Sequence, residues 1–309
     1  MGIAFIFLAI SSPLSVLQMG FAMPNSVIFH ASSINFPKNC FHFQPCKAEK
    51  FVTLRVKHLA GGVSCCKREL IDLQERTSPN EVRKEIEQCY ELIHRLGRGI
   101  VYLGSSRLGP DHAHYSRALE LAKEAAKLLD CTSWTGAGPG LMDAVIKGAL
   151  EAGKPVGGFK IGKEAGEWTA TNFHPYLPPA TYLTCRFFSA RKHGLVDAAV
   201  RNKESDRTAV VGLPGGIGTL DEIFEILALI QLERLGSKHP VPFLLMNYDS
   251  FYSKLLEFLE DCSGRGTLGK EELASLWKVC DDNEEALAHL ANFYNISFVS
   301  QNVELLYTD

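Results

Sequence analysis

Short apolar runs that end in glycine-rich loops, each followed by a helical pattern, constrain the fold of this chain more than any other feature. Three such loops occur, at residues 104–106, 136–140 and 215–219. Strands that alternate with helices along a chain predict a parallel sheet covered by helices on both faces. Because connections between parallel strands are right-handed, the pattern predicts a Rossmann-like, doubly wound α/β fold.

The expected strands and helices lie between residues 75 and 300, with no internal repeat or low-complexity linker among them. The apolar runs predict strands at residues 100–103, 131–134, 156–159, 208–213 and 241–246. Helical patterns predict helices at residues 79–96, 140–152, 187–200, 219–235, 250–261, 270–276 and 283–293, and one more that begins at Asp111 or His112. We therefore expect a single domain over residues 75–300.

The first 70 residues differ in composition from the rest of the chain. The first Lys or Arg is Lys38, the first acidic residue is Glu49, and serine is frequent before them. An acid-poor, serine-rich segment is typical of a transit peptide, whereas a secretory signal requires basic residues that positions 1–10 lack. The apolar run at residues 3–10 is too short to span a bilayer. We expect residues 1–70 to be a cleaved leader for the chloroplast or another organelle; a secretory or cytoplasmic location is the alternative.

The charge and the cysteine content exclude several classes of partner. The 32 Lys and Arg residues nearly balance the 35 Asp and Glu residues, so the net charge is −3. A domain that binds nucleic acid requires a basic surplus, so we expect no nucleic-acid partner, and we expect no membrane partner either. The nine cysteines form no CxxC pair, so neither a zinc site nor a disulfide framework is predicted. His112 and His114 do not share a helix face, and we expect no metal there.

The first two glycine-rich loops have the composition of a phosphate site. In an open parallel sheet, the loops that follow the strands lie together at the carboxyl edge, where ligands bind. Glycine lets backbone N–H groups approach an anion, and the next helix adds the positive end of its dipole. One such loop could be a simple tight turn, but three on one edge favour a phosphate-bearing ligand. The candidate binding residues here are Gly104, Ser105, Ser106, Gly136, Gly138 and Gly140.

Two nucleotide-binding motifs are absent from these loops. Neither GxxxxGK[ST] nor GxGxxG occurs in these three loops. A Walker A nucleoside triphosphatase and an enzyme that uses NAD are therefore not predicted.

The third loop is more specific, because it reads PGGIGTLDE over residues 214–222. Glu222 is expected in the first turn of a helix that begins at Thr219, where the helix dipole favours its charged form and a bound phosphate opposes it. A glutamate held between these influences can act as a base or stabilise a cation. The alternative is that Asp221 and Glu222 only complement the helix dipole.

Basic residues gather just before a second helix. Arg186, Arg191 and Lys192 lie near its expected start, where cations oppose the helix dipole and require a compensating anion. Arginine offers a planar fork that matches phosphate. A solvated basic turn is the alternative.

The combined motifs resemble the Lonely Guy (LOG) family, also labelled a lysine decarboxylase family. The matching segments are residues 103–106, 135–142, 187–192 and 214–222, within a resemblance that spans about residues 95–262. The resemblance implies a Rossmann-like homodimer or higher homo-oligomer that hydrolyses the N-glycosidic bond of nucleoside 5′-monophosphates without a cofactor. Plant members act on N6-substituted adenosine monophosphates and release free cytokinin and ribose 5-phosphate.

The resemblance also implies roles for individual residues. Arg191 and Glu222 correspond to the catalytic pair of the family. Glu222 would stabilise the oxocarbenium-like ribose and orient the attacking water, and Arg191 would hold the phosphate or ribose in register. The residues implied to shape the phosphate and ribose site are Lys192, Gly215, Gly216, Gly218 and Thr219. No lysine offers a convincing site for pyridoxal phosphate, so the decarboxylase label is not supported.

One departure from the family pattern leaves the substrate open. Compact members carry GLMG where this chain reads Gly140-Leu141-Met142-Asp143, which is similar to a longer branch of the family. That branch includes general purine nucleotide phosphoribohydrolases and carriers of the molybdenum-cofactor type that bind without turnover. The presence of both Arg191 and Glu222 favours an enzyme, because a carrier does not require a poised carboxylate.

The helix expected at residues 219–235 is apolar on more than one side. One stripe consists of Leu220, Ile223, Phe224, Leu227 and Ile230, and further apolar residues are Ile226, Leu229 and Leu232. A helix that is apolar around most of its surface is buried on more than one side. We therefore expect it to contribute to a dimer interface.

Overall fold

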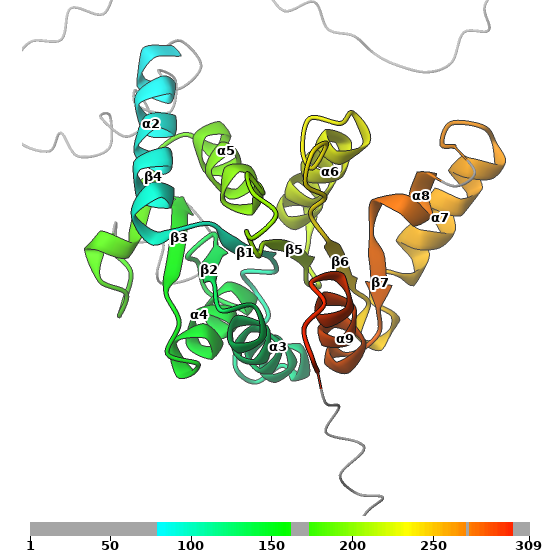
Figure 1. Cartoon of the computed structure of the whole chain (residues 1–309), viewed down its shortest axis with the longest axis horizontal. Helices are drawn as coiled ribbons and strands as arrows, with labels where there is room; N and C mark the ends of the chain where they lie inside the picture. Colours follow the sequence, from blue (N-terminus) through cyan, green and yellow to red (C-terminus); the bar gives the residue numbers. More distant parts are fainter. Residues whose placement is uncertain (1–78, 162–172, 270–271, 299–309) are drawn as a thin grey trace, which may run out of the picture. The chain divides into compact units, whose positions relative to one another are not determined.

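A computed structural model of the chain describes residues 79–161, 173–269 and 272–298 (Figure 1). The described residues all belong to the second of two units into which the chain divides, Gly61–Asp309. The expected leader at residues 1–70 lies outside the described residues. No helix in the described part is long and apolar enough to cross a membrane.

The described residues form a sheet of seven strands in the order β4-β3-β2-β1-β5-β6-β7, and every neighbouring pair is parallel (Figure 1). The strands are β1 (Gly99–Leu103), β2 (Thr132–Thr135), β3 (Val156–Ile161), β4 (Tyr182–Cys185), β5 (Ala209–Gly212), β6 (Phe243–Met246) and β7 (Lys278–Cys280). The chain moves outward from β1 to β4 and then returns to place β5 on the other side of β1. This order defines a doubly wound α/β fold, so the predicted fold class is confirmed.

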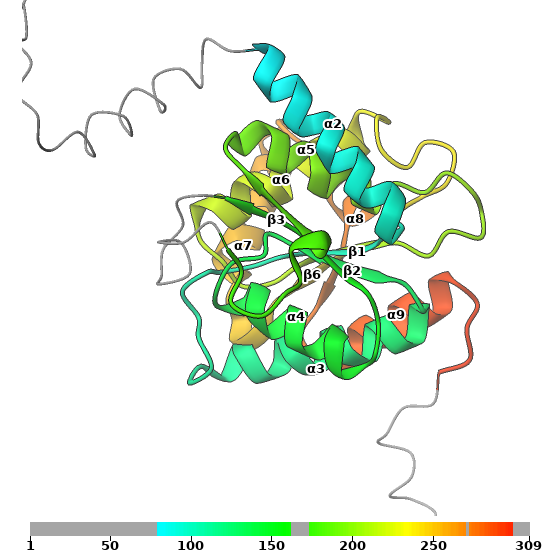
Figure 2. The ribbon, with the colours of Figure 1, turned by 90° about the vertical axis from the view of Figure 1, so that its left-hand side faces the viewer.

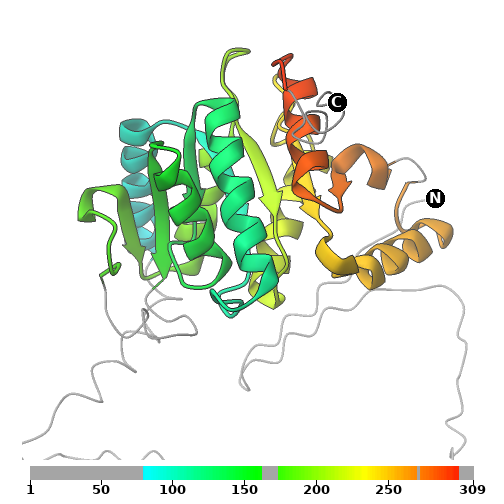
Figure 3. The ribbon, with the colours of Figure 1, turned by 90° about the horizontal axis from the view of Figure 1, so that it is seen from below.

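Helices cover both faces of the sheet. The α-helices are α2 (Pro79–Leu96), α3 (Ala113–Leu129), α4 (Leu141–Glu151), α5 (Phe188–Ala199), α6 (Ile217–Gln231), α7 (Ser253–Gly264), α8 (Glu272–Leu276) and α9 (Asn283–Phe293), and two short 3-10 turns are η3 (Pro179–Thr181) and η4 (Tyr248–Ser250). Figures 1 and 2 show α2, α5 and α6 on one face and α3, α4 and α9 on the other. Figure 3 shows the second face, where α3 lies between α4 and α9 and contacts both.

The central strands are buried on both sides, which explains their continuous apolar runs. In β1, Val101 and Leu103 pack into the core that includes α2, α5 and α6. Ile100 and Tyr102 point the opposite way, into the core with α3, α4 and α9. A parallel strand sandwiched in this way has no polar face to display, so its residue pattern does not alternate.

Two strands were not expected from the sequence. β4 lies at one edge of the sheet and has only its two terminal residues buried, and β7 is three residues long at the other edge. Edge strands are half-solvated and short, so their sequences lack a clear apolar run.

The prediction for the bounds of α6 was wrong at both ends. The helix begins at Ile217 because the carbonyl of Gly216 accepts the first intrahelical bond, from the N–H of Leu220 at 2.9 Å. It ends at Gln231 because Glu233 adopts a left-handed conformation with φ of 54°. The N–H groups of Arg234 and Leu235 then both bond to the carbonyl of Leu229, which closes the turn.

Trp134 of β2 anchors the core beneath α2 and α5. Its side chain is fully buried, and its ring stacks on Phe159 with centroids 5.2 Å apart. Its indole N–H donates to the carbonyl of Gly97 at 3.0 Å, so its single polar atom is satisfied. A Cβ on Gly157 would lie 2.4 Å from the ring, so that position must remain glycine.

We expect Trp134→Ala to lower the free energy of unfolding by about 3–5 kcal/mol, because it leaves a cavity and removes the stack with Phe159. Urea denaturation monitored by circular dichroism measures this loss. Leu150→Ala, at a residue that is 46% exposed on α4, is the matched control and should change stability by less than about 0.5 kcal/mol. Equal effects of the two substitutions would contradict the assignment.

Candidate functional site

The switch in strand order between β1 and β5 positions the main candidate site. Ligands in doubly wound sheets bind at this point, outside the carboxyl ends of the strands. A pocket of about 550 Å³ lies there. Its walls come from the loop after β1, from α4, α5 and the end of β3, and from the start of α6; the lining residues are Gly104, Ser105, Ser106, Arg107, Met142, Ile161, Phe188, Arg191, Gly216, Ile217, Gly218, Thr219 and Glu222.

Backbone hydrogen bonds tie the three glycine-rich loops together. The N–H of Leu213 donates to the carbonyl of Leu103 at 2.8 Å, and the N–H of Ser105 donates to the carbonyl of Pro214 at 3.1 Å. The N–H of Leu141 donates to the carbonyl of Ser105 at 2.8 Å. The loop after β1 is therefore fixed to both of the others, and the pocket is formed before any ligand arrives.

Several of the predicted glycines support the pocket without lining it. Gly140 has a φ of +69°, and a Cβ there would lie 2.4 Å from the carbonyl oxygen of Ser105. A Cβ on Gly136 would lie 2.3 Å from Nη2 of Arg191. Gly138 is buried and is not among the lining residues. Gly140 thus allows close approach of the loops, and Gly136 allows close approach of the Arg191 guanidinium.

The start of α6 presents an open backbone to the pocket. Gly216 is the N-cap residue and no side chain caps the helix. A Cβ at Gly216 or Gly218 would have no neighbour within 4 Å, whereas one at Gly215 would collide with the Thr219 side chain. The first N–H groups of a helix have no intrahelical partner and carry the positive end of its dipole. This turn is suited to an anion such as a phosphate.

Glu222 lies in the second turn of α6, and the expectation that it lies in the first turn was wrong. The reason is the earlier start of the helix at Ile217, which leaves no acidic residue in the first turn. A carboxylate therefore does not compete with a ligand for the free N–H groups. The dipole alone also explains Glu222 poorly, because the effect falls off beyond the first turn.

Arg191 of α5 and Glu222 of α6 form an ion pair inside the protein. The Nη2 atom of Arg191 lies 3.1 Å from Oε1 of Glu222, and the two side chains are only 6% and 7% exposed. The same Nη2 atom lies 4.0 Å from Sδ of Met142. Burying two charges costs several kcal/mol per ion, so such a pair is weak grounds for a stabilising role. Its position at the pocket makes it a candidate for chemistry.

Lys192 occupies a different place from the one implied by the resemblance. Its ammonium lies 3.1 Å from Oδ2 of Asp221 and 3.0 Å from Oε2 of Glu225, both on α6. It does not line the pocket. Lys192 thus joins α5 to α6 on the side next to the Arg191–Glu222 contact.

The anion expected near Arg186 is supplied by the chain itself. Arg186 forms an ion pair with Glu81 of α2. The Glu85 carboxylate accepts hydrogen bonds from the backbone N–H of Arg186 and of Phe187, each with a shortest distance of 3.0 Å. The start of α5 is therefore occupied by protein carboxylates, and it is not a phosphate site.

Arg107, which no sequence motif indicated, lines the pocket on an exposed part of the loop after β1. Its backbone N–H donates to Oγ of Ser105 at 3.1 Å. A basic residue directly after a Gly-Ser-Ser loop was the available signal. The other lining residues that were not candidate site residues are apolar: Met142, Ile161, Phe188 and Ile217.

Asp143, the residue that departs from the compact family pattern, has a structural explanation. It is buried, and its carboxylate accepts hydrogen bonds from the hydroxyls of Tyr115 and Tyr176. Lys147 adds an ion pair at 2.9 Å. Asp143 therefore connects α4 to α3 and to the segment around residue 176.

The described residues contain no group of three or more His, Cys, Asp or Glu side chains that could hold a metal. Nδ1 of His112 accepts from the N–H of His114 and so caps α3, and Nε2 of His114 lies 2.9 Å from Asp249. Cys89, Cys131, Cys185, Cys262 and Cys280 are free thiols.

Comparison with known proteins identifies the family. A family model described as "Possible lysine decarboxylase" matches residues 142–290. The rice protein named "Probable cytokinin riboside 5'-monophosphate phosphoribohydrolase LOGL6" (Oryza sativa subsp. japonica) is 31% identical over 195 residues, which cover 60% of this chain and 68% of the relative. The chain belongs to the Lonely Guy family.

Further members of the Lonely Guy family show similar identity. Cytokinin riboside 5'-monophosphate phosphoribohydrolase LOG4 of Arabidopsis thaliana is 28% identical over 174 residues, covering 56% of this chain and 72% of that protein. The enzyme of the same name from Rhodococcoides fascians is 29% identical over 161 residues, covering 50% and 69%. Among solved structures, the molybdenum cofactor carrier protein of Chlamydomonas reinhardtii is 19% identical, with a TM-score of 0.41, over 64% of this chain and 99% of that one.

The buried imidazole of His174, near the Asp143 cluster, predicts a pH dependence of stability. Burial lowers its pKa from 6.5 to about 4, and Nδ1 accepts the N–H of Leu177 at 3.0 Å. Between these values the unfolded chain binds a proton that the folded chain does not. Stability contributed by neutral His174 is therefore present above pH 6.5 and is lost as the pH falls toward 4.

We expect the free energy of unfolding, measured by urea titration, to fall from pH 6.5 to pH 4. His174→Asn keeps a side-chain acceptor and removes the titration, so its profile should be flatter over this range. His94→Asn, at an exposed position on α2, is the control and should keep the wild-type slope. A wild-type slope in His174→Asn would exclude this histidine as the cause.

Proposed function

We propose that the protein hydrolyses the N-glycosidic bond of nucleoside 5′-monophosphates and releases the free base and ribose 5-phosphate. The observation that carries the proposal is the ion pair of Arg191 with Glu222, buried beside an uncapped helix start in one pocket. The names of the Lonely Guy relatives support the same class of reaction.

The phosphate end of the substrate fits the start of α6. The N–H groups of this turn, the open glycines Gly216 and Gly218, and the hydroxyl of Thr219 surround the space where a phosphate can bind. Ser105 and Arg107 face it from the loop after β1. Binding the phosphate there fixes the ribose near the second turn of the helix, where Glu222 lies.

Glu222 acts on the sugar in this proposal. As the bond between C1′ and the base breaks, positive charge develops on the ribose, and a carboxylate beside C1′ stabilises it. The same carboxylate orients a water molecule, whose hydroxyl joins C1′ while its proton passes to the departing base. Arg191 holds the Glu222 carboxylate in place at the pocket through the contact at 3.1 Å.

The base would contact the apolar part of the pocket. Ile161, Phe188 and Ile217 provide it, and Ile217 is 84% exposed although it is a large apolar residue. An exposed apolar side chain at a pocket rim is suited to an alkyl substituent on the ligand. We therefore propose N6-modified adenosine 5′-monophosphates, the precursors of free cytokinins, as the preferred substrates.

The first test is a product assay on the purified protein. We expect release of free base and ribose 5-phosphate from N6-isopentenyl-AMP, and slower release from AMP. Equal release from both would favour a general purine nucleotide phosphoribohydrolase. Tight nucleotide binding with no release from either would replace the proposal with a carrier.

The role of the carboxylate has its own test. Glu222→Gln keeps the shape and a bond to Arg191 but removes the charge, so kcat should fall by about 10²–10³-fold. Asp221→Asn, at the neighbouring and half-exposed acid outside the pocket, is the matched control and should retain kcat within a few-fold. Full activity of Glu222→Gln would remove the proposed mechanism.

We further propose that α6 contributes to a homodimer. Its outward face carries Ile217 and Phe224, which are 84% and 38% exposed, and the exposed small residue Ala228; Leu232, 65% exposed, follows directly after the helix. An apolar stripe of this length on one helix is typical of a surface that a partner covers. A second copy is the partner that the family resemblance implies.

Light scattering after size-exclusion chromatography tests this interface. We expect the wild-type protein to be dimeric at micromolar concentration and Phe224→Glu to be monomeric, because the substitution places a charge in the apolar stripe. Phe258→Glu, at a residue 61% exposed on α7 and outside the stripe, should remain dimeric. A wild-type monomer at micromolar concentration would contradict the proposal.

A further inference from the structure

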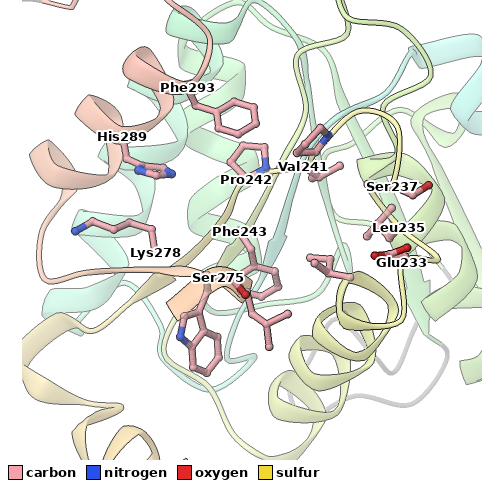
Figure 4. A pocket seen from close by; sticks show the side chains of 15 residues that line it. Glu233, Leu235, Ser237, Val241, Pro242, Phe243, Ser275, Lys278, His289 and Phe293 are labelled. Atoms are coloured by element: carbon pink, nitrogen blue, oxygen red, sulfur yellow. The ribbon is translucent and has the colours of Figure 1, made fainter. Parts of the chain in front are cut away.

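A second pocket of about 560 Å³, similar in size to the first, lies near the amino ends of strands β6 and β7 (Figure 4). It is next to Phe243 and Lys278, the first residues of β6 and β7. Because the strands are parallel, their amino ends lie at the opposite end from their carboxyl ends, where the Arg191–Glu222 pocket lies. None of the sequence motifs for phosphate binding contributes to it.

The floor of this second pocket consists of core side chains. Leu235, Val241, Phe243 and Trp277 are 2–8% exposed, and what remains exposed of them faces the hollow. Figure 4 shows the rings of Phe243, Pro242 and Phe293 around the space. The walls combine apolar and aromatic side chains with polar groups, and the volume is within the range of sites for small organic molecules.

The pocket is held in shape from outside. The guanidinium of Arg201 donates to the carbonyl of Pro240 at 2.8 Å. It also lies over the ring of Phe293, with 5.7 Å between Cζ of Arg201 and the ring centroid. This links the loop after α6 to α9 across the pocket. A site whose walls are fixed in advance loses less entropy when a ligand binds.

The charges of the pocket disfavour an anionic ligand. The pocket is lined by one lysine, Lys278, whose ammonium lies 2.6 Å from the carboxylate of Glu285 and is therefore already paired. Burial, and secondarily Lys278, lower the pKa of His289, so the imidazole is neutral at physiological pH and can donate or accept one hydrogen bond. The carboxylate of Glu233 and the hydroxyls of Ser237 and Ser275 complete the polar lining.

We propose that this second pocket binds an uncharged, planar heteroaromatic molecule of the purine-base type. The ring would lie against Phe243 and Phe293, and its N–H groups would donate to Glu233 and to the hydroxyl acceptors. Figure 4 shows His289 on the side opposite Glu233 and Ser237, so hydrogen bonds reach the two ends of one flat ligand. This binding requires no turnover and is independent of the hydrolysis proposed above.

Equilibrium dialysis of adenine against the full chain tests the proposal with two pocket-filling variants. Ser275→Trp places a large ring at the mouth of the second pocket from an exposed position. Gly218→Trp fills the first pocket, where a Cβ has no neighbour within 4 Å. We expect adenine to bind saturably to Gly218→Trp, and we expect this binding to be lost when Ser275→Trp is added to Gly218→Trp. Ser116→Trp, at an exposed serine of α3, is the matched control and should bind as the wild type does.

The opposite result, with adenine bound to Ser275→Trp and lost in Gly218→Trp, would place all binding in the first pocket and overturn the proposal. A second variant, His289→Phe, keeps a ring and removes the hydrogen bond, and it should weaken adenine binding in the Gly218→Trp background by about tenfold. Binding of AMP that is tighter than that of adenine in this background would show that the pocket takes an anion, contrary to the proposal.

Discussion

The buried contact between Arg191 and Glu222 requires accurate positioning of both side chains, and neighbouring residues provide it. Two ionised groups removed from water must be positioned accurately, because their attraction repays the lost hydration only at short range. Gly136 must lack a side chain, because a Cβ there would displace the Arg191 guanidinium. Lys192 contributes through its ion pairs with Asp221 and Glu225, which join α5, the helix of Arg191, to α6, the helix of Glu222.

In the first pocket, different parts of the fold provide the anion-binding groups and the carboxylate. The start of α6 offers backbone N–H groups to an anion, and the carboxylate is one turn further along the same helix. The strand order places this helix opposite the loop after β1, and backbone hydrogen bonds join the two. In the proposed hydrolysis, a charged group that is fixed before the substrate arrives would require little reorganisation, which is the main source of electrostatic catalysis.

The fold class follows from the sequence because buried parallel strands are apolar throughout and end in glycine. The same logic fails at the sheet edges, so β4 and β7 were not foreseen. The start of α6 was misplaced because Ile217 and Gly218 are helical here, although a glycine-rich run is usually read as loop. The motifs named most of the polar residues of the first pocket but not Arg107, and they could not show that Lys192 turns toward α6. The second pocket has no motif at all, because its walls come from segments between residues 230 and 293 that only the fold brings together.

The residue at position 143 of the glycine-rich motif is coupled to residues elsewhere in the chain. Its carboxylate is the shared acceptor for Tyr115 and Tyr176 and the counter-ion of Lys147. Replacing it with the glycine of the compact members would leave the buried Tyr115 hydroxyl without that acceptor, at a cost of about 1–3 kcal/mol. The four residues therefore form an epistatic set. Exchanging one form of the motif for the other therefore costs less stability when the tyrosines change together with Asp143 than when Asp143 changes alone.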